Sequence, residues 1–348
     1  MRGNLARILL YGNFKPQDFE RCWLKWLQES GYTVSVFERG AAVRRLCRYR
    51  LADRVLRRLA PPLLAWYESR SFVETACKFQ PDLVVVVCGN LLTGEALDEI
   101  RAETSATLFH FHNEDFLNTR STSRCMQDAA PHYDQCFTTK SFNVREMGKR
   151  GINRVTYVPH GYRNHCHFPV AVSRAELRRY GSSVVFVGTW EPPRAEILEH
   201  LEGYDLRIWG NFWERLPRRS WLRHHVEGRA VYCAELSRVF NASEICLAFL
   251  RKVNRDRHTS RTFEIPACGG FQVSERTDEV LTFFEEGKEI ECFSSEEELK
   301  DKITYYLAHD TQRRRIAAAG FERVRRSHYS FTDRLQTLLE HYFRLRSQ

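Results

Sequence analysis

Apolar runs of strand length alternate with segments of helical periodicity along most of this chain, and this alternation restricts the possible folds more than any other feature. The mostly apolar run 5–11 meets the turn signal Gly12-Asn13. Apolar residues then recur at helical spacing over 19–27, before a second strand-length run at 33–37. A strand, a helix and a strand in succession are typical of a βαβ unit, which predicts a parallel sheet.

The same alternation continues through two successive halves of the sequence. Further strands are predicted at 82–88, 106–112, 133–138, 155–159, 184–187, 206–209, 245–249 and 271–274. Helices are predicted at 41–78 with a break at Pro61-Pro62, and at 95–102, 141–149, 194–201, 236–242, 262–267, from Ser295, 311–326 and 332–344. The chain is therefore expected to form two α/β domains of similar size, each built on a parallel sheet.

The stretch 163–181 has no strong period, and we expect a hinge there. The predicted segments are an N-terminal domain at 1–165, a hinge at 166–181, a second domain at 182–330 and a closing helix at 331–348. Open parallel sheets bind ligands at the carboxyl ends of their strands, so two sheets that face each other would enclose a cleft. Transferases, epimerases, two-domain dehydrogenases and binding proteins of the periplasmic kind all suit this build.

Apolar segments and cysteines indicate the compartment. Even a long uninterrupted apolar run such as Leu83 to Cys88 is far shorter than the roughly 20 residues that a membrane-spanning helix needs. The N-terminus lacks the long apolar region of a signal peptide, so we expect a cytoplasmic protein. The eleven cysteines show no CxxC spacing and are expected to be free thiols in a reducing compartment.

The net charge of +9 favours anionic partners. Arginines interleave with apolar residues at helical spacing over 43–59, which predicts a basic amphipathic helix. This helix could touch the inner face of a membrane, which would suit a lipid-linked acceptor, or it could present a solvated face while packing on the N-terminal domain. Nucleic acid is not an expected partner because the chain has no recognised motif or aromatic-plus-basic platform for it.

The densest group of polar residues lies at 254–270, just before and within a predicted short helix. Arginines and a helix start make an anion site, and Glu264 inside the helix could accept hydrogen bonds from ribose hydroxyls. The alternative is a solvated basic loop with Glu264 in a surface salt bridge. The other residues proposed here for donor binding are Arg257, His258, Thr259, Arg261 and Thr262.

Several segments of the sequence resemble one family. The C-terminal stretch is SRTFEIPACGGFQVSERTDEVLTFFEEGKEIECFSSEEELKDKITYYLAHDTQRRRIAAAGFERV, and it is preceded by VVFVGTWEPPRAEIL, FHFHNEDF and FTTKSFNVREMGKRGINRVTYVPHGY. Together they are similar to the CgeB-like glycosyltransferases, relatives of the large retaining family-four group, over about Pro81 to Tyr342. The resemblance implies the GT-B fold, with two Rossmann-like domains across a cleft and a final helix that returns to the N-terminal domain.

The family's motifs carry over onto particular residues. Glu264 matches the second glutamate of a paired-glutamate motif, which holds the donor ribose, and Asp256 stands at the position of the first. Gly188 matches the glycine of the donor-domain loop. Thr189 stands where the family has an arginine, and Arg194 lies near the place of its lysine. One basic partner of the diphosphate is thus missing, and we hypothesise that Arg257 or Arg261 replaces it.

The resemblance also implies a retaining reaction, in which the leaving phosphate takes the acceptor proton. An inverting enzyme would need a general base near the acceptor hydroxyl, and the candidates are His110, His112, Glu114 and Asp115. Strand packing for the two histidines, and a loop or capping role for the two acids, are the alternatives. Gly12 and Asn13 either let a substrate approach the backbone or form an ordinary turn.

Metal independence is expected because no DxD motif stands out, and the HxH pairs at His110 and at His165 lack a second ligand pair. Fixed arginines can stabilise the leaving diphosphate in place of a metal. We therefore expect a glycosyltransferase without a bound cofactor. It would transfer a sugar from a nucleotide diphosphate, with UDP as the default, to a glycan, lipid-linked or small-molecule acceptor. The alternatives are a sugar-nucleotide epimerase of similar build and a non-catalytic binding or structural protein.

Overall fold

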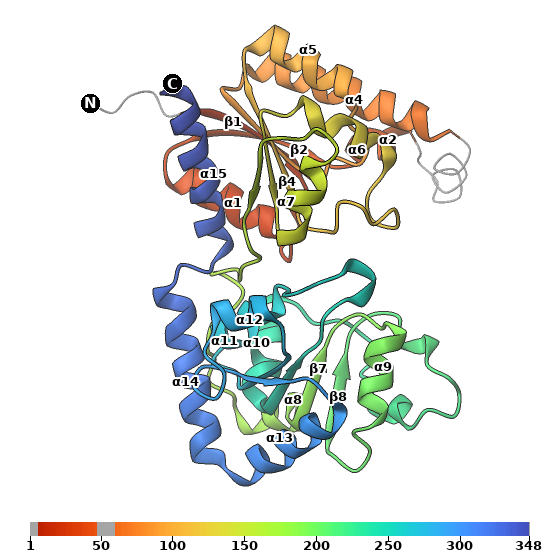
Figure 1. The fold of residues 1–348 in the computed structure, drawn as a ribbon, viewed down its shortest axis with the longest axis vertical. Coiled ribbons are helices and arrows are strands. Elements are labelled where there is room, and N and C mark those ends of the chain that lie inside the picture. Colours follow the sequence, from red (N-terminus) through yellow and green to blue (C-terminus); the bar gives the residue numbers. More distant parts are fainter. Residues whose placement is uncertain (1–5, 47–59, 348) are drawn as a thin grey trace. The chain divides into compact units, whose positions relative to one another are not determined.

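The computed structural model describes residues 6–46 and 60–347 of the chain. They form two compact units (Figure 1). Unit 1 comprises the residues before His160 together with those from Arg334 onward, and unit 2 runs from His160 to Asp333. Each unit is a parallel sheet with helices packed on it, as the strand–helix alternation predicts.

The sheet of unit 1 has six strands in the order β2-β1-β3-β4-β5-β6, and all neighbouring pairs are parallel. The strands are β1 (Arg7–Gly12), β2 (Thr33–Glu38), β3 (Leu83–Val87), β4 (Thr107–His112), β5 (Gln135–Thr138) and β6 (Val155–Tyr157). The order reverses at β1, and β3 is a run of leucine and valine that is buried throughout. Such continuous apolar strands occur where helices cover both faces of a parallel sheet.

Most helices of unit 1 lie close to predicted positions, but the two short helices at 124–129 and 130–132 are not predicted by the sequence. They are α1 (Phe19–Glu29), α2 (Ala41–Leu46), α4 (Pro61–Phe79), α5 (Gly94–Thr104), α6 (Arg124–Ala129), η1 (Ala130–His132) and α7 (Ser141–Gly148). In α1 the apolar residues fall on one stripe, so Trp23 and Leu27 are fully buried. Of the basic helix predicted at 43–59, positions 47–59 lie outside the described residues.

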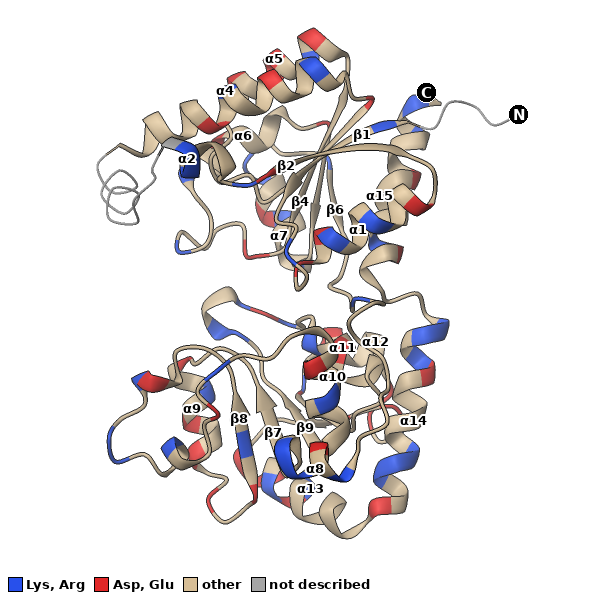
Figure 2. Ribbon diagram, turned by 180° about the vertical axis from the view of Figure 1, so that it is seen from behind, with Lys and Arg blue, Asp and Glu red and all other residues tan. Residues whose placement is uncertain are grey.

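The last helix, α15 (Phe331–Arg346), belongs to unit 1 from Arg334 onward and lies beside α1 in both ribbon views (Figures 1 and 2). Its Leu335 and Leu338 are fully buried. The prediction that the final helix returns to the N-terminal domain is thus confirmed.

Unit 2 contains a five-stranded sheet in the order β11-β10-β9-β7-β8, again with every pair parallel. Its strands are β7 (Ser182–Val187), β8 (Leu206–Trp209), β9 (Ser243–Ala248), β10 (Gln272–Glu275) and β11 (Glu291–Phe293). Its helices are α8 (Arg174–Tyr180), α9 (Pro192–Glu199), η2 (Trp213–Arg215), η3 (Trp221–His224), α10 (Cys233–Ala242), η4 (Lys252–Asn254), α11 (Arg261–Ala267), α12 (Asp278–Phe283), α13 (Glu296–Ala308) and α14 (Asp310–Arg326).

Unit 2 contains a helix that the sequence does not predict, and one expectation about the cysteines is corrected there. The aperiodic stretch 163–181 contains the helix α8, whose Ser173 and Glu176 form a reciprocal capping box that marks its start. Cys166 and Cys233 are joined in a disulfide, so the expectation that all cysteines are free thiols is wrong for this pair. The two residues lie 67 positions apart, and no spacing in the sequence indicates the pairing.

None of the helices within 6–46 and 60–347 combines the length and apolar character that crossing a bilayer requires.

Candidate functional site

Glu264 lies at the centre of a buried ionic cluster in unit 2. It sits in α11, the short helix that follows the loop after β9, and only 1% of its surface is exposed. The Arg163 guanidinium donates to Glu264 Oε1 at 2.7 Å, and the Arg261 guanidinium donates to Oε2. His167 Nε2 lies 3.6 Å from Oε1. The predicted ribose-binding carboxylate is therefore an acceptor held in place by two arginines, and the alternative of a surface salt bridge does not fit its burial.

Charges around Glu264 influence one another strongly because water is largely excluded. Burial, reinforced by the nearby Arg163 charge, lowers the pKa of Arg261 to about 9. Burial and the charges of Arg163 and Arg261 also hold the pKa of His167 well below its usual range. His167 is therefore neutral at physiological pH, and the two guanidinium groups supply the positive charge of the cluster.

Arg261 also connects this cluster to the loop at 188–191 between β7 and α9, which the sequence predicts to bind the donor and which we call the donor loop. Its Nε donates to the carbonyl of Val187, the last residue of β7, at 3.1 Å. The loop turns at Gly188, whose carbonyl accepts from Trp213 Nε1 at 2.9 Å. The same carbonyl faces Gly210, where an added Cβ would lie only 1.8 Å from it. Glycine at position 210 thus lets the carboxyl ends of β7 and β8 approach each other closely.

The buried Arg194 side chain forms a hydrogen bond with the backbone of the donor loop. It is 7% exposed, and its two terminal nitrogens donate to the carbonyls of Thr189 at 3.1 Å and Phe249 at 3.2 Å. Burial lowers its pKa, but an arginine stays charged at any physiological pH. Among the described residues, its Nε has no hydrogen-bond partner. The residue near the family's lysine position is therefore a buried cation that spans the ends of β7 and β9.

Side chains of the loop before α11 form hydrogen bonds within the loop and with the start of the helix. Asp256, 9% exposed, accepts from Asn254 Nδ2 at 2.7 Å. The backbone amide of Thr259 donates to Thr262 Oγ1 at 3.1 Å, and Thr259 Oγ1 accepts from the amide of Arg261 at 3.2 Å. Thr259 and Thr262 therefore act as local caps in this structure, and their part in donor binding stays a prediction.

Both ring nitrogens of His258 have a hydrogen-bond partner. Nδ1 lies 2.7 Å from Glu279 Oε2, and Nε2 accepts from the backbone amide of His160 at 3.1 Å. These partners assign the proton to Nδ1, because Nε2 must keep its lone pair to accept. Arg257, by contrast, is largely exposed, with Nη1 4.0 Å from Glu279 Oε1. Glu279 thus supports the loop from α12.

Three residues of this cluster were missed by the sequence-based reasoning. Arg163 and His167 lie in the stretch where a hinge is expected, and Glu279 lies in a helix that the sequence does not predict. The crowding of histidines and arginine in 160–167 was a visible signal, but nothing in the spacing connects it to Glu264.

A pocket of about 480 Å³ opens at the carboxyl end of β8, beside the donor loop. Gly210 and Trp213, which contact the Gly188 carbonyl, also line the pocket, together with Phe212 and Gly228. Unit 2 therefore has a concave surface at the carboxyl end of β8, in contact with the turn at Gly188.

In unit 1 the predicted acceptor-side histidines are interior side chains. His110 Nε2 lies 2.9 Å from the Cys88 carbonyl, and its ring stacks on Tyr133 with centroids 4.9 Å apart. His112 Nε2 lies 3.4 Å from Thr122 Oγ1. Burial lowers the pKa of His110 to about 4 and holds that of His112 well below its usual range. Both rings are neutral at physiological pH, which agrees with the strand-packing interpretation.

The two acids after β4 differ in exposure. Asp115 is 3% exposed, and its Oδ1 accepts from the backbone amide of Leu117 at 3.1 Å. Its own carbonyl accepts from Thr122 Oγ1 at 3.2 Å. Glu114 is only half-buried. Asp115 therefore organises the loop, while the catalytic role predicted for either acid stays a prediction.

The turn at Gly12 and Asn13 packs on an acid that the sequence-based reasoning overlooked. Glu20 Oε1, from the first turn of α1, accepts from the Asn13 amide at 3.2 Å, and an added Cβ at Gly12 would meet Glu20 Cγ at 2.9 Å. Burial raises the pKa of Glu20 to about 7. The glycine thus makes room for a buried carboxyl group at the carboxyl end of β1.

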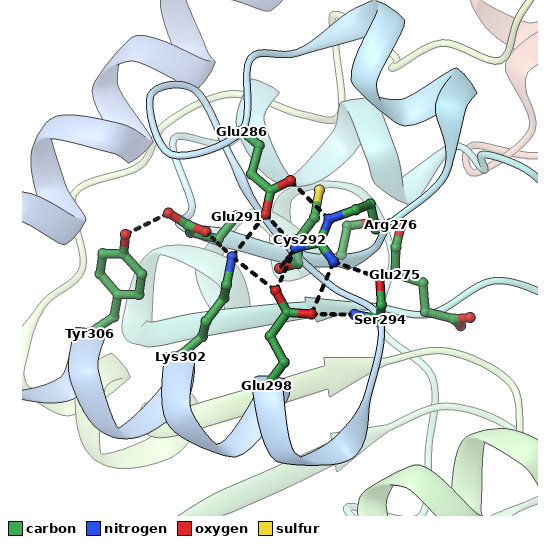
Figure 3. Close-up of polar contacts among 10 residues, drawn as sticks. Glu275, Arg276, Glu286, Glu291, Cys292, Ser294, Glu298, Lys302 and Tyr306 are labelled. Carbon is green, nitrogen blue, oxygen red and sulfur yellow. Dashed lines mark hydrogen bonds and ion pairs between the residues drawn. The ribbon is translucent and has the colours of Figure 1, made fainter.

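A second charged cluster in unit 2 is a structural feature (Figure 3). Arg276 donates to Glu286 Oε1 at 2.6 Å and to Glu298 Oε2 at 2.9 Å, and Lys302 donates to Glu286 Oε1 at 2.9 Å and to Glu291 Oε2 at 2.5 Å. These pairs connect β10, β11 and α13. Each acid of the cluster is paired with Arg276 or Lys302, and this indicates a role in holding the elements together.

Within 6–46 and 60–347, no group of three or more histidines, cysteines or acids is arranged to hold a metal ion.

Comparisons with known proteins find similarity in sequence and in fold. Residues 194–340 match the family described as glycosyl transferase-like. The spore protein CgeB of Bacillus subtilis (strain 168) is 23% identical over 185 residues, which are 47% of this chain and 56% of CgeB. The chain thus matches little more than half the length of that curated relative.

Solved structures of similar fold cover nearly the whole chain. Sucrose-phosphate synthase from Thermosynechococcus elongatus aligns with a TM-score of 0.71 at 14% identity, over 98% of this chain and 99% of its own. HepE from Anabaena, in complex with UDP-glucose, aligns with a TM-score of 0.61 at 12% identity, over 99% of this chain and 100% of the HepE chain. The predicted GT-B fold is confirmed by these structures. The predicted resemblance agrees with the match of residues 194–340 to the glycosyl transferase-like family and with the similarity to CgeB over 185 residues.

Proposed function

We propose that this protein is a glycosyltransferase that binds a UDP-sugar at the carboxyl edge of the unit 2 sheet and transfers the sugar with retention. One observation carries the proposal: the buried Glu264 carboxylate is held by Arg163 and Arg261 beside the donor loop. An ionised carboxylate has about four lone-pair sites, so Glu264 can accept from ribose hydroxyls as well as from the arginines. The UDP-glucose complex of HepE, a protein of the same fold, supports the choice of nucleotide.

The reaction needs stabilisation of a leaving group. The bond between sugar C1 and the diphosphate oxygen breaks, and its electron pair stays on the diphosphate. A bond then forms between C1 and the acceptor oxygen, and the acceptor proton passes to the leaving phosphate. Buried guanidinium groups act strongly on such developing charge because little water screens them. Arg261 and Arg194, which both contact the ends of β7, are the cations we assign to this role.

A second candidate is binding of a nucleotide sugar without transfer. Thr189 stands where the family has an arginine, and Asp256 replaces a longer glutamate. Asp256 accepts from Asn254 within its own loop, and its shorter side chain reaches less far. Release of UDP from UDP-glucose in the presence of an acceptor separates the two candidates, because a binding protein would release none.

The test is a thermal-shift series with UDP, GDP, ADP, CDP and dTDP on the wild type and on Glu264→Ala. A ligand at a hundred times its dissociation constant adds about 2.7 kcal/mol to the free energy of unfolding, which raises Tm visibly. We expect a shift with UDP that the variant loses. Glu202→Ala, at an exposed position of the same unit, is the matched control and should keep the shift.

Loss of a buried carboxylate beside two arginines could unfold the protein, so Glu264→Gln completes the test. Glutamine keeps the shape and one acceptor oxygen while removing the charge. A folded Glu264→Gln protein with weaker UDP binding supports the proposal. The absence of a shift with any nucleotide on the wild type would overturn the donor site.

A further inference from the structure

A pocket in unit 1 lies outside the residues that the proposed function uses. It has a volume of about 800 Å³ and is lined by residues of α4, α5, α6 and the loop after β3. Trp66, Val73, Leu91 and Ala96 contribute apolar surface, and charged residues of the three helices complete the lining. A cavity of this size falls within the range of small-molecule sites, which are about 300–1,000 Å³.

Hydrogen bonds fix the inner wall of this pocket. Ser69 Oγ, on α4, donates to the Leu91 carbonyl at 3.2 Å and accepts from the Thr93 amide at 3.1 Å. Ser123 Oγ donates to the Asn90 carbonyl at 2.6 Å. The loops after β3 and before α6 are thereby joined to α4. The wall is preformed, so a ligand would not have to order it at a cost in affinity.

The same wall is hydrogen-bonded to the loop after β4, which carries the predicted acceptor residues of unit 1. Asn90 Nδ2 donates to the Ser121 carbonyl at 3.0 Å, and Ser121 lies in the loop that begins after β4. Glu114 and Asp115 come from the first part of that loop. The pocket therefore adjoins the carboxyl edge of the sheet, where open α/β folds bind their substrates.

Trp66 gives the pocket an aromatic wall. It is 61% exposed, although a large aromatic side chain usually gains stability from burial. An exposed indole that lines a cavity offers a flat apolar face with an N–H donor at its edge. This combination fits a ligand that is flat, partly apolar and rich in hydroxyls, as a pyranose ring is.

The charges of the lining identify the class of ligand further. Arg70 and Arg124 face the pocket together with Glu95, Glu99 and Asp128, and Figure 2 shows both signs of charge on α4 and α5. Arg70 is already paired with Glu99 at 3.2 Å. Three carboxylates against two guanidinium groups disfavour an anion, whereas hydroxyls can donate to the acids and accept from the arginines. A plain acyl chain offers no hydrogen-bonding groups to these charged side chains at the rim.

We propose that this pocket binds the glycan part of a neutral acceptor, with a pyranose ring stacked on Trp66 and its hydroxyls on the acids and arginines of the rim. The inference rests on the proposed function, because it supplies an acceptor for the sugar that unit 2 would donate. It makes the pocket a second binding site, separate from the donor cluster around Glu264.

The experiment measures binding of maltotriose, cellotriose and chitotriose to the full chain by saturation-transfer NMR and calorimetry, with sialyllactose and octanoate as anionic and apolar probes. We expect one of the neutral trisaccharides to bind saturably. Trp66→Ala should raise its Kd by about tenfold or more, equivalent to about 1.4 kcal/mol. Leu63→Ala, an exposed position on the same helix that does not line the pocket, should leave Kd unchanged.

The outcomes separate this inference from the donor proposal because UDP binding is followed in the same samples. A retained UDP shift with no saturable trisaccharide would overturn the glycan site alone. Equal affinity of the wild type and Trp66→Ala would do the same, as would preferential binding of octanoate or sialyllactose. Trisaccharide binding without any UDP shift would instead support the glycan site and overturn the proposed donor site. Asp128→Asn, which keeps the shape of the rim, should weaken trisaccharide binding less than Trp66→Ala does.

Discussion

The Arg163 guanidinium donates to Glu264 Oε1 at 2.7 Å although the two residues lie 101 positions apart in the sequence. This contact joins the segment after β6 to the short helix α11, and it sets the orientation of the carboxylate that we assign to ribose binding. A buried ion pair adds little net stability, but removing one partner leaves an unpaired buried charge and costs several kcal/mol.

Arg163→Ala should therefore weaken both donor binding and stability. The variant leaves Glu264 with Arg261 as its remaining arginine partner, so the carboxylate is free to rotate. We expect the Kd for UDP to rise about tenfold and the free energy of unfolding to fall by about 2–4 kcal/mol. Calorimetry and urea unfolding measure the two quantities. Arg178→Ala, at an exposed position on α8, serves as control, and equal UDP affinity in both variants would contradict the role of Arg163.

Gly210 tests the geometry of the donor loop. An added Cβ would lie 1.8 Å from the Gly188 carbonyl, so Gly210→Ala must displace the turn. At Gly203 the backbone also has a positive φ, but an added Cβ meets nothing within 4 Å. Gly203→Ala should cost about 1 kcal/mol from backbone strain alone. Gly210→Ala should cost clearly more than 2 kcal/mol. Similar thermal stability of the two variants would show that the loop tolerates displacement.

Glu20 should make stability fall as the pH rises. Burial raises its pKa in the folded state to about 7, above the ordinary value of 4.5, so the folded protein binds this proton more tightly than the unfolded chain does. The stabilising contribution is complete below about pH 4.5 and is lost as the pH rises through 7. Glu20→Gln should thus be more stable than the wild type by about 1–3 kcal/mol at pH 8 and equal to it at pH 4. Glu29→Gln, at an exposed site of the same helix, should show no such trend in urea unfolding.

The cluster around Arg276 should give the opposite trend in acid (Figure 3). Hydrogen bonds from Arg276 lower the pKa of Glu298 to about 2, below its ordinary value of 4.5. The stability from this pair is present above pH 4.5 and is lost as the pH falls toward 2. Because the pair is partly exposed, Arg276→Ala should cost only about 1–2 kcal/mol at pH 7, and the difference should vanish near pH 2. Arg314→Ala, which removes an exposed pair with Asp310, should cost less than about 0.5 kcal/mol. A constant deficit of Arg276→Ala across this pH range would contradict the assignment.

The last helix should be needed for the stability of unit 1. Leu338 of α15 is fully buried, whereas Phe343 of the same helix is 46% exposed. Leu338→Ala should lower the free energy of unfolding by about 2–4 kcal/mol, and Phe343→Ala by less than about 1 kcal/mol. Deletion from Phe331 onward should lower Tm further than Leu338→Ala does. An unchanged melting curve for the deletion would show that α15 only rests on the surface.

The strand pattern was readable from the sequence because parallel strands with helices on both faces are continuous apolar runs. β3, a run of leucine and valine, lies where it was predicted, and β8 matches the predicted bounds. Shorter elements such as β11 and α12 were missed, because three to six residues do not establish a period. The helix α8 was overlooked although Ser173 and Glu176 carry a capping signal, since its exposed residues show little periodicity.

For the site, the sequence by itself determined which residue types stand near one another along the chain: Glu264 among the arginines of one loop, Gly188 at the end of a strand, and two acids after another strand. Only the tertiary structure decided that Arg163 reaches Glu264, that Glu279 supports His258, and that Glu20 is buried beneath Gly12. The physical reason is that periodicity and motif spacing are local, whereas burial and pairing depend on which strands become neighbours. A carboxylate's pKa and partners follow from that packing, and no spacing in the chain encodes them.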